Sequence, residues 1–238
     1  MSIFQEALST AFALILQRDA DLIEIIGLSM QVSLTALFIA CLLGLPLGAL
    51  MGSRDFRFKQ SLRGIFNALM GIPPVVVGLI VYLNLSRSGL FGALELLYTP
   101  TAMIIAQVII ILPIIAALSS QIFEDLHEEY RDLFTSLVVS APKALLAYII
   151  DARYSLLTII LAGFGRAISE VGAVMIVGGN IDHLTRVMTT AIALETSKGE
   201  LALALALGII LLLLALLVNF AAQQFKSFQS VQRYGGGR

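Results

Sequence analysis

Two charged residues lie four positions apart inside an otherwise apolar run. Arg166 and Glu170 fall within Leu156–Val177, a stretch long enough to cross a bilayer. An unpaired charge at mid-bilayer costs on the order of 3 kcal/mol or more, so we expect the two side chains to neutralise each other and to face protein. Two interpretations stay open. The pair locks helix packing or a subunit contact, or it lines a route for an anion and rearranges as that route opens.

A second apolar run, Gly64–Leu85, contains the cluster Gly71, Pro73, Pro74 and Gly78. Adjacent prolines remove backbone N–H donors and kink a helix, and flanking glycines let another chain approach closely. The cluster predicts a gate or hinge in this span. The alternative is a kink that serves only the packing of helices.

Polar residues follow the run that contains Arg166. Gly178, Gly179 and Asn180 end it, and Arg186 lies a few residues further on. An amide and a guanidinium at the mouth of a route would suit an oxyanion, whose recognition needs neutral hydrogen-bond donors as well as positive charge. The segment can equally be an ordinary solvated loop.

Composition places these residues in a membrane protein. Of 238 residues, 58% are hydrophobic and 13% charged, with a formal net charge of −1, whereas soluble domains carry about 25% charged residues. The near-neutral charge excludes nucleic acid as an expected partner. Cys41 is the single cysteine, and His127 and His183 are expected on opposite sides of the membrane, so no metal site is predicted.

The predicted fold is an all-α membrane protein with five transmembrane helices. A further helix over Ile3–Leu16 is short and contains Glu6, which favours an amphipathic helix in the interface over a signal peptide. The five predicted spans are Ile26–Met51, Gly64–Leu85, Thr99–Ile122, Leu156–Val177 and Leu201–Ala222.

Lysine and arginine are distributed unequally between the two sides. Positive residues near the ends of spans are retained on the cytoplasmic side. One side has ten lysines and arginines and the other has four, which predicts an outside N-terminus and a cytoplasmic C-terminus. We therefore expect an external segment over residues 1–21, a membrane domain over 22–222, a cytoplasmic loop over 123–155 and a cytoplasmic tail over 223–238. The cytoplasmic set is Arg54, Arg57, Lys59, Arg63, Arg131, Lys143, Arg153, Lys226, Arg233 and Arg238, and the external set is Arg18, Arg87, Arg186 and Lys198.

The cytoplasmic loop contains an amphipathic pattern. Apolar residues recur at helical spacing from Leu133 to Leu145, which predicts a short helix outside the membrane. Pro142 should end this helix. Its apolar stripe can rest on the protein's own helix ends or on lipid, or it can dock in a groove of a cytoplasmic partner.

Catalytic machinery is not expected in this chain. The sequence contains no G-x-x-x-x-G-K-[ST] phosphate loop, so ATP is not expected to bind here in that way. It also lacks a nucleophile, histidine and acid predicted on one side of the membrane. The chain is therefore not predicted to be an enzyme, and any ATP-driven motor must be another subunit.

Several segments resemble type I ABC-importer permease subunits, and within that group they look most like tungstate-transport permeases. The resemblance covers about Gly27 to Asn219. It is carried by GIPPVVVGLIVYLNLSRSG (Gly71–Gly89), YTPTAMIIAQ (Tyr98–Gln107), LAGFGRAISEVGAVMIV (Leu161–Val177) and RVMTTAIALETSKGELALALALG (Arg186–Gly208).

The resemblance implies a permease that moves tungstate, or a related oxyanion such as molybdate, across a prokaryotic plasma membrane by alternating access. It implies a homodimer, two cytoplasmic ATPase subunits that bind ATP and Mg, and an extracytoplasmic substrate-binding protein. A stand-alone ion-coupled secondary transporter or channel remains the alternative, and it predicts transport without ATP.

The family's Glu-Ala-Ala-x-x-x-Gly motif maps onto the predicted cytoplasmic helix, where only the acidic character of its first residue is retained. In the family this helix docks in a cleft of the ATPase. The resemblance therefore assigns contact with the ATPase to Asp132, Leu133, Phe134, Leu137 and Val138.

Overall fold

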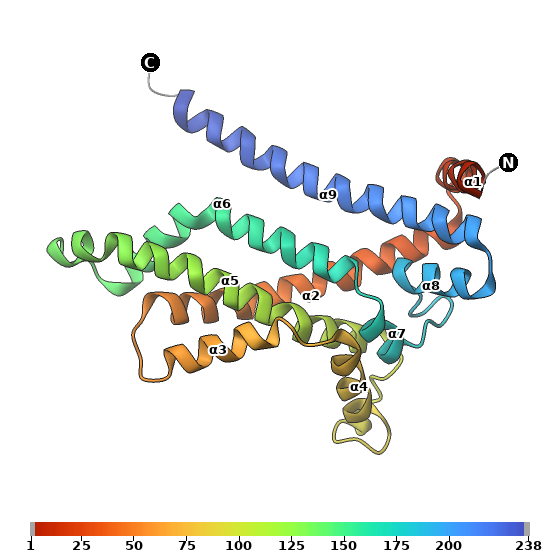
Figure 1. Ribbon diagram of the computed structural model, residues 1–238, viewed down its shortest axis with the longest axis horizontal. Helices are drawn as coiled ribbons and strands as arrows, with labels where there is room; N and C mark the ends of the chain where they lie inside the picture. The colour runs from red at the N-terminus through yellow and green to blue at the C-terminus, as the bar shows by residue number, and fades with distance from the viewer. Residues whose placement is uncertain (1–2, 236–238) are drawn as a thin grey trace.

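A computed structural model describes residues 3–235, and every regular element within that range is helical. The predicted all-α class is confirmed (Figure 1). Residues 1–2 of the predicted external segment and 236–238 of the predicted tail lie outside the described residues. The elements are α1 (Ile3–Gln17), α2 (Ala20–Ser53), α3 (Lys59–Leu69), α4 (Pro74–Leu85), the 3-10 helix η1 (Gly92–Leu94), α5 (Pro100–Ser136), α6 (Ala141–Ile168), α7 (Gly172–Gly178), α8 (Met188–Lys198) and α9 (Leu201–Gly235).

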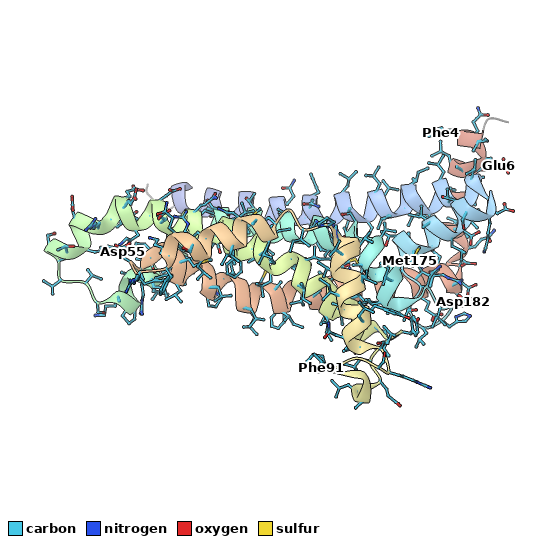
Figure 2. All side chains as sticks on the ribbon, turned by 60° about the horizontal axis from the view of Figure 1, so that its bottom comes forward. Phe4, Glu6, Asp55, Phe91, Met175 and Asp182 are labelled. Carbon is cyan, nitrogen blue, oxygen red and sulfur yellow. The ribbon has the colours of Figure 1, made fainter. Side chains whose placement is uncertain are left out.

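Four long helices, α2, α5, α6 and α9, run along the length of the molecule (Figure 1). Each contains a stretch long and apolar enough to cross a membrane. The α2–α3 turn and the α5–α6 turn lie at one end, whereas α1, α8 and the start of α9 lie at the other. Figure 2 shows the same separation, with Asp55 at the first end and Glu6 and Asp182 at the second.

The predicted span Gly64–Leu85 is wrong as a single helix. It consists of α3 and α4, which meet at 97°, and α4 projects away from the bundle (Figure 1). Pro73 is extended with ψ 125°, and Pro74 is the first residue of α4. Because a proline disfavours helical geometry in the residue before it and can begin a helix, the pair separates two helices. Five spans result only if this bent pair counts as one.

The predicted span Leu156–Val177 also has different bounds. Helix α6 begins earlier, at Ala141, and ends at Ile168, and α7 follows after a three-residue break. Arg166 lies in the last turn of α6, whereas Glu170 lies within the break. The two charged residues therefore do not share one continuous helix.

The separate cytoplasmic helix predicted from Leu133 to Leu145 is absent. Helix α5 continues without interruption to Ser136, and only residues 137–140 separate it from α6. Neither proline nor glycine occurs between residues 114 and 136, so nothing in the backbone stops α5 where the membrane span was expected to end. Pro142 is the second residue of α6, and there it starts a helix instead of ending one.

The N-terminal helix matches its predicted position. Helix α1 packs on α9, burying Ala7 and Ala11, while Phe4, Leu8 and Phe12 stay exposed. Two small residues thus let the helices approach, and larger apolar residues face outward. This distribution suits the expected interfacial location, which stays a prediction. Helix α9 continues to Gly235, so the predicted tail begins as helix.

The most extensive contact in the fold joins α2 and α5. Gly44, Gly48 and Gly52 line the side of α2 that faces α5. A Cβ atom at Gly48 would lie 2.9 Å from the Ala116 carbonyl oxygen, closer than packed atoms tolerate. Glycines spaced by four residues allow two backbones to approach where lipid supplies no hydrophobic driving force.

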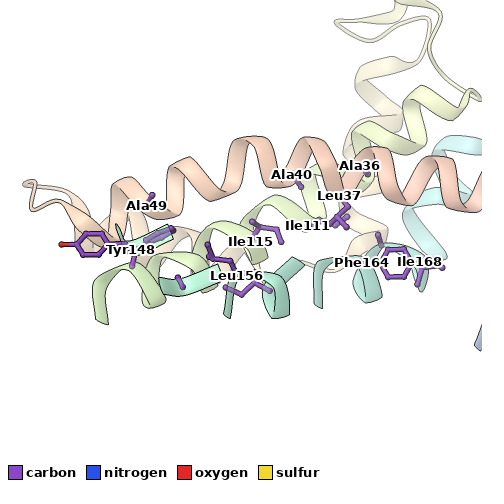
Figure 3. Packing of buried hydrophobic residues seen from close by; sticks show 14 residues of the cluster. Ala36, Leu37, Ala40, Ala49, Ile111, Ile115, Tyr148, Leu156, Phe164 and Ile168 are labelled. Carbon is purple, nitrogen blue, oxygen red and sulfur yellow. The ribbon is translucent and has the colours of Figure 1, made fainter. Parts of the chain in front are cut away.

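Helix α6 completes this core. Its residues join those of α2 and α5 in one buried cluster (Figure 3). Ala36 and Ala40 of α2 lie near Ile111 and Ile115 of α5, and Leu156 of α6 is part of the same cluster. Small residues on α2 therefore face large ones on α5 and α6, which fills the space between the three helices.

We expect Gly48→Ala to lower the melting temperature of the purified chain in detergent. Overpacking costs about 1–3 kcal/mol, or about 2–4 °C per kcal/mol for a chain of this size. Gly27→Ala is the matched control, because no atom lies within 4 Å of its added Cβ and alanine favours helix. It should leave the melting temperature unchanged or raise it. Equal effects of the two substitutions would contradict the close contact.

Candidate functional site

The break between α6 and α7 is built around Glu170. This side chain is 4% exposed, and its carboxylate accepts hydrogen bonds from Arg166 Nη1 at 2.6 Å and from Ala173 N at 3.0 Å. The expected ion pair is therefore present. Arg166 is 31% exposed, so its guanidinium reaches the edge of the bundle while the carboxylate stays inside. Glu170 joins the end of α6 to the start of α7.

Two further polar residues hold the backbone of this break. Gln107 Nε2 of α5 donates to the Ala167 carbonyl at 3.1 Å, and Thr189 Oγ1 of α8 donates to the Glu170 carbonyl at 2.8 Å. Carbonyls at a helix end need partners, and here α5 and α8 supply them. Neither residue was expected at this break, since Thr189 falls in the polar stretch predicted on the outer side. The available signal was Gln107 itself, an amide within a strongly apolar run.

Helices α4 and α7 cross tightly beside the break. A Cβ atom at Gly78 would lie 2.7 Å from Ala173 Cα, and one at Gly172 would lie 2.7 Å from Val75 Cγ2. Ala173 is also the residue whose N–H binds Glu170. The structure therefore brings two predicted features together, the buried Gly78 and the Arg166–Glu170 pair.

The rest of the proline and glycine cluster lies apart from this contact. Gly71 and Pro73 are exposed, and Pro74 is half-buried at the start of α4. They shape the α3–α4 bend. Among the described residues, no hydrogen bond connects them to the Arg166–Glu170 pair. Gly78 is the member of the cluster that reaches the break.

The predicted outer mouth is a tightly folded segment. The hydroxyl of Thr185 donates to the Gly178 carbonyl at 2.6 Å and accepts from Ile181 N at 2.9 Å. Gly179 ends α7 with φ +73°, a left-handed conformation that glycine adopts freely. Asn180 follows with φ +51°. The two glycines therefore terminate and pack α7.

Arg186 of the predicted outer mouth forms one ion pair, and its buried Nε has no hydrogen-bond partner among the described residues. Arg186 Nη1 binds Asp182 Oδ1 at 2.6 Å, with Arg186 23% exposed. His183 in the same loop binds Glu24 of α2 through Nδ1 at 2.9 Å, and this carboxylate holds the pKa of His183 above its usual value. The ion pair requires a protonated His183. It is therefore present below the raised pKa of His183, where Glu24 is still ionised, and it weakens as pH rises past that pKa. Among the described residues, no group of three His, Cys, Asp or Glu is placed to hold a metal.

At the opposite end, the residues predicted to contact an ATPase divide into two sets. Leu133, Leu137 and Val138 are 50%, 64% and 88% exposed, and Asp132 is exposed beside them. Phe134 instead packs inside the α5–α6 corner, with its ring centroid 5.3 Å from that of Tyr130 and 5.7 Å from that of Tyr148. Phe134 holds the corner together, and the other four residues present a surface.

A hollow of about 550 Å³ opens beside this corner, between the end of α2 and the two helices of the corner. Within the described part of the chain no carboxylate lines it, and neither of its arginines is ion-paired. Nearby Lys59 and Arg63, in contrast, both pair with Glu124. The polar lining is formed by Ser53, Arg54, His127, Arg131, Thr135 and Tyr148, above an apolar floor.

The turn of the corner requires an unusual backbone at Val138. Its φ is +50°, a left-handed conformation that is a genuine outlier for a β-branched residue. The resemblance places the motif's glycine at this position. The conformation explains why glycine suits the position, even though this chain has valine there.

We expect Arg166→Leu to destabilise the chain by about 3 kcal/mol, the lower end of the range for a broken buried pair because Arg166 is 31% exposed. The loss follows from leaving the Glu170 carboxylate buried without its cation. Arg166→Leu with Glu170→Gln should recover more than half of the loss, because the amide still accepts from Ala173 N. Denaturation of the three proteins in detergent measures this, and no recovery would argue against the pairing.

Val138→Gly should raise the melting temperature. A left-handed L-residue costs about 1–2 kcal/mol, of which glycine's greater unfolded-state freedom cancels about 0.5–1 kcal/mol. Val139→Gly is the matched control, because Val139 lies in the same turn without a positive φ, and it should lower the melting temperature. A fall in both variants would contradict the strain at Val138.

Comparison with known proteins agrees with this architecture. Residues 44–228 match the family described as binding-protein-dependent transport system inner membrane component. The chain is 41% identical over 222 residues to a probable anion ABC transporter permease protein of Haloferax volcanii, covering 91% of this chain and 95% of the relative. It is 39% identical over 219 residues to the tungstate uptake system permease protein TupB of Peptoclostridium acidaminophilum, covering 92% and 96%.

The protein of the same name in Campylobacter jejuni is 38% identical over 172 residues, covering 72% of each chain. The match to the family extends over most of the helical bundle, including both helices of the α5–α6 corner and the α6–α7 break. The chain therefore belongs to the family of inner membrane components of binding-protein-dependent transport systems, as a multi-pass membrane permease.

Proposed function

We propose that the cargo of this permease is tungstate or a related oxyanion such as molybdate, moved inward by alternating access. The observation that carries the proposal is the extent of the similarity to a permease named for tungstate uptake, which covers 92% of this chain. It is supported by the relative named as a probable anion permease, which covers a similar share.

The proposed location is a prokaryotic plasma membrane, with the N-terminus outside and the C-terminus in the cytoplasm. The α2–α3 and α5–α6 turns lie at the same end of the bundle (Figure 1), and seven residues of the ten-residue set lie in or near these turns in the sequence, between 54 and 63 or between 131 and 153. Positive residues are retained on the cytoplasmic side. The α5–α6 corner then faces the cytoplasm.

The proposed motor is a pair of ATPase subunits that bind ATP and Mg and dock on the α5–α6 corner. Val138 and Leu137 are apolar and largely exposed, and on the cytoplasmic side no lipid would cover them. The neighbouring hollow presents Arg54 and Arg131 without carboxylate partners among the described residues. A partner that places apolar side chains on the tip and a carboxylate in the hollow would complement both features.

The proposed route follows the junction of α4, α6 and α7 in a homodimer, with a substrate-binding protein at the outer end. Arg166 reaches the bundle edge beside this junction, and the crossing at Gly78 is tight enough that α4 and α7 must move together. Gly71, Pro73 and Pro74 then act as the hinge of α4. The outer segment from Gly178 to Arg186 forms the mouth through its backbone, since Arg186 is already paired.

Reconstitution tests the function directly. The chain is placed in liposomes with its ATPase and its binding protein, and tungstate, molybdate, sulfate and phosphate are compared. We expect tungstate or molybdate to stimulate ATP hydrolysis and to accumulate inside only when ATP is present. Stimulation by sulfate or phosphate alone would contradict the proposed cargo. Flux through the chain alone, without ATP, would replace the proposal by a secondary transporter or channel.

A double substitution tests the docking surface. Leu137→Asp with Val138→Asp should abolish co-purification of the ATPase, because two charges replace the exposed apolar tip without disturbing the Phe134 cluster. The matched control is Leu90→Asp, an 86% exposed leucine in the loop after α4, which should retain the ATPase. Undiminished ATPase binding by the double variant would contradict docking at the corner.

A further inference from the structure

A small polar cavity lies inside the bundle next to the α6–α7 break. Its volume is about 10 Å³, and residues of α2, α5, the end of α6, the break and the start of α8 line it. Hydroxyl, amide and carboxylate groups line it, which is unusual for the interior of an apolar bundle. The polar residues in its wall are Ser29, Ser33, Gln107, Glu170 and Thr189.

One polar atom in this wall has no partner. Gln107 is 4% exposed, and its Nε2 donates to the Ala167 carbonyl. Its Oε1 atom is buried and accepts no hydrogen bond from any described residue. A buried acceptor without a donor is costly, and the few that occur in native structures usually bind ordered water.

Ser29, Thr189 and Glu170 in the wall are already engaged in hydrogen bonds. Ser29 Oγ accepts from Met188 N at 2.8 Å and donates to the Ile25 carbonyl at 2.6 Å. Thr189 donates to the Glu170 carbonyl. The hydroxyl of Ser33, which is 3% exposed, faces the same cavity from α2 and can donate or accept. Gln107 of α5 and Ser33 of α2 therefore offer the free hydrogen-bonding capacity of the wall.

We infer that this cavity holds one buried water molecule, which donates to Gln107 Oε1 and binds the Ser33 hydroxyl. A space of about 10–15 Å³ is what one water requires, and the site offers the two or more polar partners that a buried water needs. The water ties α2 to α5 at the height of the break. It adds a connection that no side chain makes directly.

Charge and size argue against other occupants. A sodium or ammonium ion would gain no net negative charge from this wall, because Arg166 already neutralises Glu170 at 2.6 Å. An anion would meet the Glu170 carboxylate in the wall, and a tetrahedral oxyanion is far larger than the cavity. The inference is thus independent of the cargo and of the proposed route.

Filling the cavity tests the inference. In the full-length chain purified in detergent, Ser33→Val should expel the water and leave Gln107 Oε1 dry, which lowers the melting temperature by about 2–4 °C or more. In a Gln107→Leu background, which lacks both the acceptor to be stranded and the bond to Ala167, adding Ser33→Val should lower the melting temperature by less than half as much as it does in the parent chain. Ser33→Ala is the control that leaves room for the water, and its melting temperature should change less than that of Ser33→Val.

If the cavity holds no water, Ser33→Val should instead raise the melting temperature, because valine would then fill an empty space. An equal loss from Ser33→Val in the parent chain and in the Gln107→Leu background would indicate a steric clash and would also overturn the inference. Exchange of sodium for potassium should leave the melting temperature unchanged, and a sodium-dependent shift would indicate a cation instead. A density map at about 2 Å should show a peak within about 3.2 Å of Gln107 Oε1, and an empty space there would exclude the water.

Discussion

Close approach of α2 and α5 is the constraint on which the rest of the structure depends. Gly44, Gly48 and Gly52 bring the two backbones together, and α6 then packs into the same core. In lipid, apolar side chains gain little by leaving the hydrocarbon for each other, so helices associate through close packing and internal hydrogen bonds. The glycine stripe provides the packing between α2 and α5, and Gln107 of α5 supplies an internal hydrogen bond to the end of α6.

That end of α6 is where the polar groups of the bundle gather. Glu170, Gln107 and Thr189 bind backbone groups that the break between α6 and α7 leaves without helical partners, and Arg166 pairs with the Glu170 carboxylate. An irregular backbone is tolerated at membrane depth only when protein or water supplies these hydrogen bonds. The charged pair therefore stabilises the break. This structural role is compatible with a role along the proposed translocation route, because Arg166 extends to the bundle edge.

The two ends of the molecule are specialised differently. The corner of α5 and α6 has an aromatic interior around Phe134, an exposed apolar tip at Leu137 and Val138, and a hollow whose two arginines have no ion-pair partner in the described part of the chain. The opposite end is closed by short-range pairs such as Arg186 with Asp182. A rigid corner can transmit force from a partner along α5 and α6 to the break, since both helices run without interruption between the two places.

Composition and periodicity determined the class, the membrane location and the approximate positions of the spans, because burial in lipid requires long apolar runs whatever the neighbours are. Local patterns also identified the Arg166–Glu170 pair and the proline pair that divides α3 from α4. The extent of α5, the break after Ile168 and the place of Gln107 were decided by tertiary structure. The position of a helix end and the role of a lone polar residue depend on which partners lie across the bundle. Gln107 and its partner Ala167 are 60 residues apart, so the local sequence around either residue does not identify the other.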